Sequence, residues 1–300
     1  MRTAKSSPRS IIRSLLAQVA VELRGAARSP DDPDAVHDLR VAIRRLNQAL
    51  RVFPEVFGQA HVKKIRRRLK KLMTALGAVR NLDVAREVLH ASKARPGTRL
   101  LHHLRDQRGS AQKLLEVRLK SWRKRETLRG WRALANGGAG AGSGASSGAS
   151  SLDRAWQELR GLAEEFLAAG NDAARRKTAY HHLHRCRLLG KRLRYSIEMF
   201  YPKGSPELQP RLKLLKELQN HLGGLNDCVT VIELIHGHPA VNQRIRVLLA
   251  QREAAFLSFW KREFNVRTRQ QWIDSFQPPN KKARTTNGTI STPARRRSTP

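Results

Sequence analysis

Residues 36–53 read VHDLRVAIRRLNQALRVF, and residues 183–200 read LHRCRLLGKRLRYSIEMF. The second stretch aligns with the first without a gap, and several cations and the closing Phe coincide. The alignment pairs His37 with His184, Arg40 with Arg187, Arg44 with Lys191, Arg45 with Arg192, and Phe53 with Phe200. An internal repeat of this kind predicts a chain built from two related halves.

Each copy has the periodicity of an amphipathic helix whose polar side is almost entirely positive. At about 100° per residue, His37, Arg40 and Arg44 share one stripe, and the large apolar residues of that copy lie opposite. The second copy places His184, Arg187, Lys191 and Arg194 together in the same way. Because like charges at this spacing repel one another, we favour a multivalent anion as partner over a solvated helix face.

The next helix of each half is also basic on one side. Residues 61–76 read HVKKIRRRLKKLMTAL, with Lys63, Arg67 and Lys70 on the polar face. Residues 210–222 read PRLKLLKELQNHL, where Lys213 and Lys216 align with Arg67 and Lys70. The repeat therefore covers a pair of helices, and two facing basic stripes would form a positive groove.

Both pairs are followed by similar segments, LGAVRNLDV at 76–84 and LGGLNDCV at 222–229. Gly77 and Gly223 are typical of helix C-termini. Four polar residues are then expected to cap the helices that follow: Asn81, Asp83, Asn226 and Asp227. The alternative is that the acids are metal ligands or counter-ions for the arginines.

The H-x-x-R-x-x-x-R/K-R pattern at 37–45 and 184–192, with these closing segments, resembles the CHAD domain (conserved histidine α-helical domain). The resemblance covers residues 10–265. It implies two helical bundles related by a pseudo-two-fold around a basic central groove or pore. It also implies inorganic polyphosphate as the ligand, with association with polyphosphate granules and their proteins.

The same resemblance implies the residues that contact the ligand and those that support it from neighbouring helices. The implied contacts are His37, Arg40, Arg44, Arg45, His184, Arg187, Lys191 and Arg192, and the implied supporting residues are Lys63, Arg67, Lys70, Lys213 and Lys216. Two positions depart from the family pattern. Asn81 stands where an acid is frequent, and Gly190 interrupts the second motif helix, at a cost of about 1 kcal/mol.

The net charge of +35 fits an anionic partner. The first ten residues and the tail from Ser275 hold only nine of these charges, so most of the excess belongs to the fold. Non-specific nucleic-acid binding is the alternative function, although the motif helices hold few aromatic residues for base stacking. Histidine held against phosphate becomes protonated more readily, which predicts tighter binding at mildly acidic pH.

Catalysis is not expected, because the chain has no GxxxxGK[ST] loop and no cluster of nucleophile, base and carboxylate. No cofactor is expected. His181, His182 and His184 diverge on a helix and lack nearby acids or cysteines, so we expect no metal site. Cys186 lies on the apolar stripe and is interpreted as a core residue. Tryptophans 122, 131, 156 and 260 are expected to pack between helices.

The fold class predicted is all-α. We expect a basic arm at 1–9, a first half at 10–135, a flexible Gly/Ala/Ser linker at 136–151, a second half at 152–265, and a disordered basic tail at 275–300. The expected helices are 9–28, 34–53, 58–76, 81–94, 98–134, 152–169, 173–200, 206–222, 226–237 and 239–264. With no apolar run of about 20 residues and no signal peptide pattern, a cytoplasmic location is expected.

Overall fold

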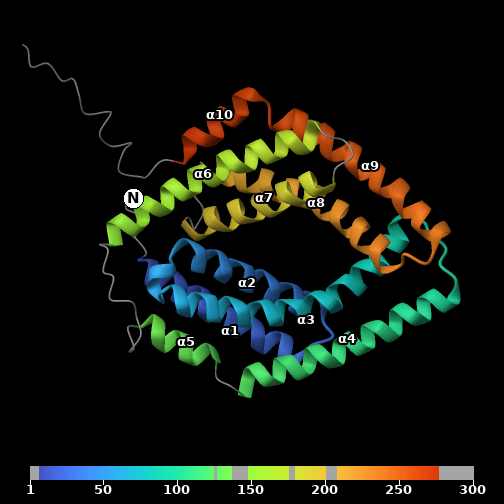
Figure 1. Cartoon of the computed structure of the whole chain (residues 1–300), viewed down its shortest axis with the longest axis horizontal. Helices are drawn as coiled ribbons and strands as arrows, with labels where there is room; N and C mark the ends of the chain where they lie inside the picture. Colours follow the sequence, from blue (N-terminus) through green and yellow to red (C-terminus); the bar gives the residue numbers. More distant parts are fainter. Residues whose placement is uncertain (1–6, 125–126, 137–147, 176–179, 201–207, 277–300) are drawn as a thin grey trace, which may run out of the picture.

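The computed structural model describes residues 7–124, 127–136, 148–175, 180–200 and 208–276. Within these ranges all the regular structure is helical (Figure 1), which confirms the all-α class. The α-helices are α1 (Pro8–Arg28), α2 (Pro33–Val52), α3 (Gln59–Ala91), α4 (Thr98–Lys124), α5 (Thr127–Ala135), α6 (Gly148–Arg175), α7 (Tyr180–Phe200), α8 (Gln209–Leu234), α9 (Pro239–Glu263) and α10 (Val266–Ser275), with a 3-10 turn η1 (Pro54–Val56) after α2.

A first core lies between α1, α2, α5 and the first part of α3. The side chain of Asp32 caps α2 by accepting a hydrogen bond from the Asp34 N–H, and Pro33 opens the helix. The apolar stripe predicted for this helix is fully buried, since Leu39, Ile43 and Leu46 are all 0 % exposed. Burial of this stripe leaves the cationic stripe on the opposite side of α2.

A second core joins α6, α7, α8, α9 and α10, and it is rich in aromatic rings. Trp260 stacks on Phe264 with ring centroids 4.2 Å apart, and Trp272 packs at 5.6 Å from Phe264. Trp272 belongs to α10, a helix that the sequence patterns did not predict. Asn265 caps this helix by accepting a hydrogen bond from the Thr268 N–H.

A third core connects the two halves, and it overturns a prediction. Gly77 and Gly223 do not end helices, because α3 and α8 continue through them to Ala91 and Leu234. The extended ends of α3 and α8 pack together with the starts of α4 and α9 around Val88, Cys228 and Val231. Apolar burial here offsets the low helix propensity of glycine, so the helices continue past the glycines that were predicted to end them.

Several predicted helix limits are also corrected. The helix expected at 98–134 is two helices, α4 and α5, and the break expected near Gly170 is absent because α6 continues to Arg175. Helix α6 begins at Gly148, inside the segment expected to be a linker. The rest of that linker from residue 137, the first six residues and the tail from 277 lie outside the described residues.

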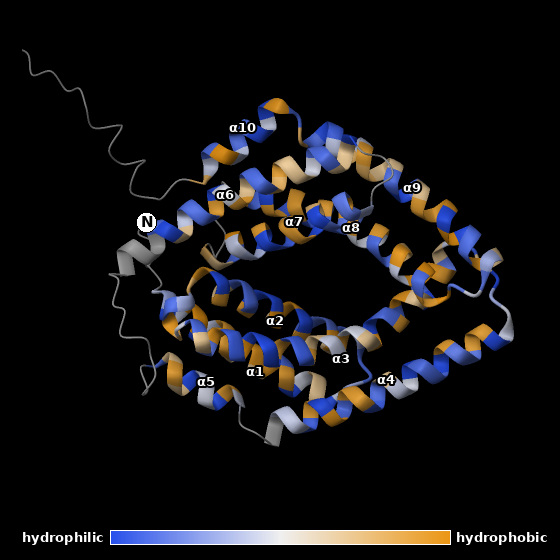
Figure 2. Cartoon of the chain, viewed as in Figure 1, coloured by the Kyte–Doolittle hydropathy of each residue, from blue (hydrophilic) through white to orange (hydrophobic). Residues whose placement is uncertain are grey.

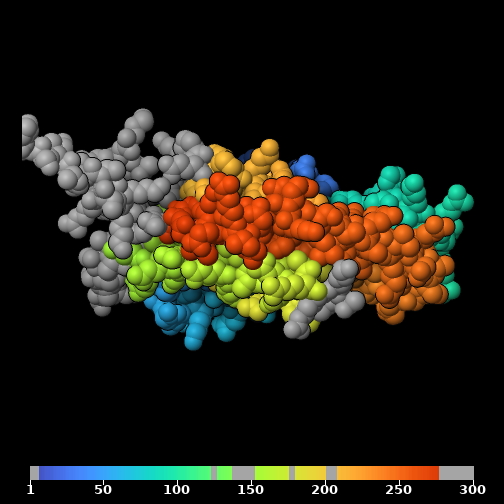
Figure 3. All heavy atoms as spheres, turned by 90° about the horizontal axis from the view of Figure 1, so that it is seen from above, coloured from blue at the N-terminus to red at the C-terminus, as the bar shows by residue number. Residues whose placement is uncertain are grey.

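The molecule is elongated, with α6, α9 and α10 along one long side and α4 and α5 along the other (Figure 1). Seen from above, α6, α9 and α10 form a continuous outer surface (Figure 3). Hydrophilic and hydrophobic residues are interspersed along the helices (Figure 2). No helix among the described residues is long and apolar enough to span a bilayer.

Candidate anion-binding site

The two motif helices, α2 and α7, pack against each other in the middle of the molecule (Figure 1). At one end of this contact the rings of Phe53 and Phe200, which the repeat had aligned, meet edge to face with centroids 6.2 Å apart. Next to them, the buried Gln48 Nε2 donates a hydrogen bond to Ser196 Oγ at 2.9 Å. These contacts hold the cationic stripes of both helices in one region.

Four cations from the two stripes form what we call the central cluster: Arg40 and Arg44 of α2 with Arg187 and Lys191 of α7. Across the α2–α7 contact, Arg187 acts electrostatically on Arg40, Arg44 acts on Arg187, and both Arg40 and Arg44 act on Lys191. Arg44 Nη1 also donates to the hydroxyl of the buried Tyr195, at 3.5 Å. The structure therefore brings together the innermost members of both predicted stripes.

Burial and neighbouring positive charges lower the pKa values of cations in the central cluster. Burial, aided by the field of Arg44, lowers the pKa of Arg40 to about 10. Burial lowers the pKa of Lys191 to about 6, with Arg187 and Arg44 adding to the effect. The pKa of Arg187 is also lowered, mainly by burial. In the ligand-free protein, Lys191 is therefore largely a neutral amine at pH 7.

Several nitrogens in this region are buried and, within the described residues, have no hydrogen-bond acceptor. They include Arg40 Nη1, Arg187 Nε, Arg192 Nε and His184 Nδ1. Room for the Arg40 guanidinium comes from Gly77, because a Cβ at that position would stand 3.2 Å from Arg40 Nη1. Buried donors without acceptors are costly, so the cluster is suited to an acceptor that comes from outside.

Two residues that sequence analysis did not assign to the site, Arg80 and Asp227, act on the central cluster. Arg80 of α3 lowers the pKa of Arg40, and its guanidinium is held by Glu87 at 3.0 Å. Asp227 of α8 is partly buried, and its charge acts on Arg187 and Lys191. Burial nevertheless raises the pKa of Asp227.

Four residues were predicted to be helix caps, and this is wrong because all four lie inside long helices: Asn81, Asp83, Asn226 and Asp227. Asp83 instead accepts a hydrogen bond from Arg108 Nε of α4 at 2.8 Å, and Asn226 accepts one from the Tyr180 hydroxyl at 2.9 Å. The acids are counter-ions for cations, which was the alternative interpretation. Tyr195 could have been assigned to the site from the sequence, because helical periodicity places it within about 20° of His184 on the cationic stripe.

Arg45 and Arg194, also predicted to be site residues, are engaged by one acid. Glu198 accepts from Arg45 Nε at 3.0 Å and lies 3.2 Å from Arg194 Nε. Arg192 lies farther along α7 and acts on Arg51 of α2. These three arginines flank the central cluster rather than belonging to it.

The two motif histidines occupy the edge of the region. His37 lies largely exposed at the start of α2, and partial desolvation of its ring together with the charge of Arg44 lowers its pKa. His184 packs its ring against Tyr180, with centroids 5.8 Å apart. His37 is therefore charged near neutral pH only if a bound anion raises its pKa again, and the same holds for Lys191.

The five residues expected to support the site all lie exposed on α3 and α8: Lys63, Arg67, Lys70, Lys213 and Lys216. Within the described residues, none of the five is hydrogen-bonded to a residue of the central cluster. Their supporting role, which both the basic helix faces and the family resemblance suggest, stays a prediction. Gly190, which was expected to loosen α7, lets this helix pack closely on α6, since a Cβ there would lie 3.3 Å from Phe166.

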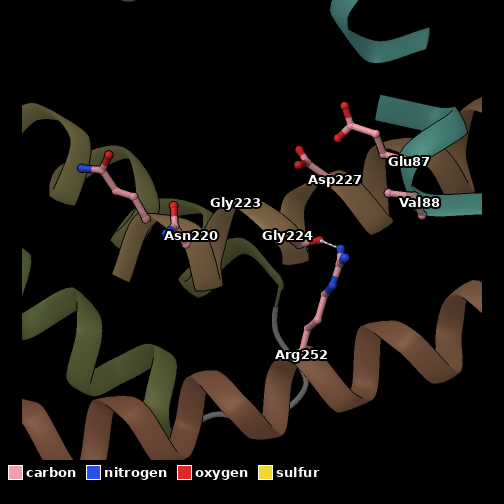
Figure 4. A pocket seen from close by; sticks show the side chains of 8 residues that line it. Glu87, Val88, Asn220, Gly223, Gly224, Asp227 and Arg252 are labelled. Atoms are coloured by element: carbon pink, nitrogen blue, oxygen red, sulfur yellow. Dashed lines mark hydrogen bonds between the residues drawn. The ribbon is translucent and has the colours of Figure 1, made fainter. Parts of the chain in front are cut away.

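A pocket of about 310 Å³ adjoins the cluster through Asp227. The carboxylates of Glu87 and Asp227 lie on one side of it, and on the other Arg252 donates to the carbonyl of Gly224 (Figure 4). No group of three or more His, Cys, Asp or Glu residues in the described chain is placed to hold a metal ion. Cys186 is buried in the second core, as predicted, and burial raises its pKa to about 12.

Comparisons with known proteins agree with this architecture. The CHAD domain family model matches residues 10–236. The crystal structure of the CHAD domain from the plant Ricinus communis superposes with a TM-score of 0.57 at 23% sequence identity, covering 89% of both chains. PptA from Streptomyces chartreusis superposes with a TM-score of 0.58 at 17% identity, covering 90% of this chain and 100% of that one.

No curated protein matches the chain. At these sequence identities the two solved structures support the fold alone. The family is shown by the family model, which matches most of the chain. The chain therefore belongs to the CHAD domain family.

Proposed function

We propose that this protein binds inorganic polyphosphate at the central cluster and does not transform it. The observation that carries the proposal is the cluster itself, in which Arg40, Arg44, Arg187 and Lys191 converge from two helices. Buried donors of Arg40 and Arg187 there have no acceptor among the described residues. A polyanion would supply both the missing acceptors and the missing negative charge.

The residue types suit a linear phosphate polymer. Arginine offers a planar fork to phosphate oxygens, whereas lysine offers a compact point charge. Arg40 and Arg44 are one helical turn apart, so successive phosphates can meet successive cations without a fixed register. Among the aromatic residues that the structure describes, only Tyr195 is hydrogen-bonded to the central cluster, and its hydroxyl already accepts from Arg44. A ligand that is recognised by its phosphate groups is therefore favoured over a nucleic acid that is recognised by stacking of its bases.

The proposal extends to the cellular role that the family resemblance implied. We expect the protein to reside in the cytoplasm at polyphosphate granules, where its partners are polyphosphate and granule proteins. Nucleic acid is expected to be a weaker competitor that responds to the overall charge of +35.

The test is a competition experiment at about 150 mM salt, where weak non-specific charge binding is screened. Labelled long-chain polyphosphate is bound to the protein and displaced by duplex or single-stranded nucleic acid at equal phosphate concentration. A variant with Arg40, Arg44, Arg187 and Lys191 changed to Ala is measured beside the parent. We expect polyphosphate to win by orders of magnitude and the variant to lose it.

A matched control removes four exposed cations elsewhere, with Arg99, Arg105, Arg244 and Arg246 changed to Ala. This control should bind almost as well as the parent, and thermal unfolding of every variant verifies its fold. Even competition by nucleic acid, or equal losses in the two variants, would show that the charge is generic and that the central cluster is not a polyphosphate site.

A further inference from the structure

Helix α3 carries an unusual concentration of positive charge. From residue 56 to residue 82 the sequence has no Asp or Glu but eight Lys or Arg residues. Lys64, Arg68 and Lys71, which we call the outer stripe, are all exposed. No ion pair among the described residues involves any of the three.

The outer stripe faces away from the central cluster. Gly77 marks the side of α3 that meets the cluster, because its missing Cβ points at Arg40. At about 100° per residue, Lys71 lies about 120° from Gly77, Lys64 about 140° and Arg68 about 180°. A single phosphate chain lying straight along the cluster would not reach these three side chains.

The three cations also form a compact row. Lys64 and Arg68 are four residues apart, and the whole stripe spans about 10 Å of helix. Like charges at this spacing destabilise an isolated helix. The buried residues Ile65, Leu69 and Leu72 hold α3 in place in spite of this repulsion, so the row stays ordered without a ligand.

We propose that the outer stripe is a second polyanion-binding surface, which takes a separate segment of linear polyphosphate and makes the protein bivalent. The choice of polyphosphate rests on the proposed function. The apolar side of α3 is already used in the core, so it is not available for insertion into a membrane surface. Residues 58–82 include no Phe, Tyr or Trp on which a base could stack.

Bivalence has a measurable consequence. A protein with two separate surfaces binds long chains more tightly through effective concentration and links one chain to another. One tripolyphosphate molecule can occupy only one surface at a time, and its tightest site should be the central cluster, where buried donors lack acceptors. Its affinity should therefore depend on the central cluster and not on the outer stripe. Long-chain affinity and chain bridging should depend on both.

The test measures whether full-length protein links biotinylated long-chain polyphosphate on beads to a second, fluorescent polyphosphate chain. We compare the parent with a variant carrying Lys64→Gln, Arg68→Gln and Lys71→Gln. The variant should keep the tripolyphosphate affinity of the parent, lose most bridging, and lose about tenfold or more in long-chain affinity. The matched control changes Lys113, Arg118 and Lys120 of α4 to Gln, which removes the same exposed charge and should bridge like the parent.

Bridging by the outer-stripe variant at the level of the parent would overturn the proposal and point instead to the basic residues after 275, which all variants keep. More efficient capture of RNA or duplex DNA than of a second polyphosphate chain would also overturn it, in favour of a nucleic-acid surface. The central-cluster variant tests the proposed function separately from the second surface. If the proposed function is correct, this variant loses tripolyphosphate binding whether or not the outer stripe binds polyphosphate. A parent that binds neither short nor long polyphosphate overturns both.

Discussion

Lys191 is the residue through which the central cluster should respond to pH. Its neighbours are Arg40 and Arg44 from α2, Arg187 on its own helix and Asp227 from α8, and burial among them lowers its pKa to about 6. A bound polyanion adds negative charge beside the amine and raises this pKa again. Binding near neutral pH therefore takes up a proton.

The first prediction follows from this linkage. Between the pKa of the free protein and that of the complex, each unit of falling pH should strengthen binding by up to about tenfold. Fluorescence anisotropy with labelled polyphosphate at pH 6.5, 7.5 and 8.5, at constant ionic strength, measures the slope. The variant Lys191→Arg keeps its charge throughout and should give a flat profile. An identical slope in the variant and the parent would assign the pH response to another group.

Gly77 gives a prediction in which stability and binding move in opposite directions. Gly77→Ala replaces a poor helix former inside α3 and should raise the unfolding free energy by up to about 1 kcal/mol. Its new methyl group would crowd Arg40 Nη1 and displace the guanidinium, so polyphosphate affinity should fall severalfold. Denaturant unfolding and anisotropy measure the two effects.

The control for this prediction is Gly109→Ala in α4, where a Cβ would have no neighbour within 4 Å. This variant should gain stability and bind like the parent. Parent-like binding by Gly77→Ala would mean that the position of Arg40 does not matter for the ligand.

At the scale of helices, the second half depends on close contact between α6 and α9. A methyl group on Gly170 would overlap the ring of Trp260, which is buried and donates a hydrogen bond to Asn171 Oδ1 at 3.2 Å. Gly170→Ala should therefore lower the unfolding free energy by about 1–3 kcal/mol, as measured by denaturant titration. Gly161→Ala, on the same helix but with open space around it, should instead be neutral or stabilising. Similar results for the two variants would contradict this packing.

Sequence patterns predicted the buried face of one helix correctly but misplaced the ends of two others. The apolar stripe that periodicity predicts for α2 is buried, because the period of an amphipathic helix shows directly in its sequence. The ends of α3 and α8 were misplaced, since Gly77 and Gly223 resemble stop signals. Whether a glycine ends a helix depends on what the following residues bury, and here Val88 and Cys228 meet in a core between the halves.

At the scale of the whole molecule, the ligand-free protein should become more stable as pH rises from 6.5 to 9. The unfolded chain keeps a proton on Lys191 up to about pH 10.5, whereas the folded chain releases it above about 6. Since the unfolded state then binds more protons, the unfolding free energy increases with pH over this window. Thermal unfolding in buffers without multivalent anions, at constant ionic strength, measures the trend.

The variant Lys191→Met removes the titrating group and should flatten this dependence while raising the melting temperature at pH 6.5. Saturating polyphosphate should stabilise the parent by mass action, most strongly at the lower pH. A parent whose melting temperature falls between pH 6.5 and 9 would contradict the burial of Lys191 as an uncharged amine.

The sequence by itself determined the helical class, the two motif helices, the residues of the cationic stripes and, through their pattern, the CHAD family. These follow from periodicity and residue type, which a linear chain displays directly. Tertiary structure decided which cations lie together and which are paired with an acid. Arg45 and Arg194 share Glu198, whereas the central cluster is held by α2 packing against α7. Burial and ion pairing depend on residues distant in the chain, so their energies become visible only after the helices have packed.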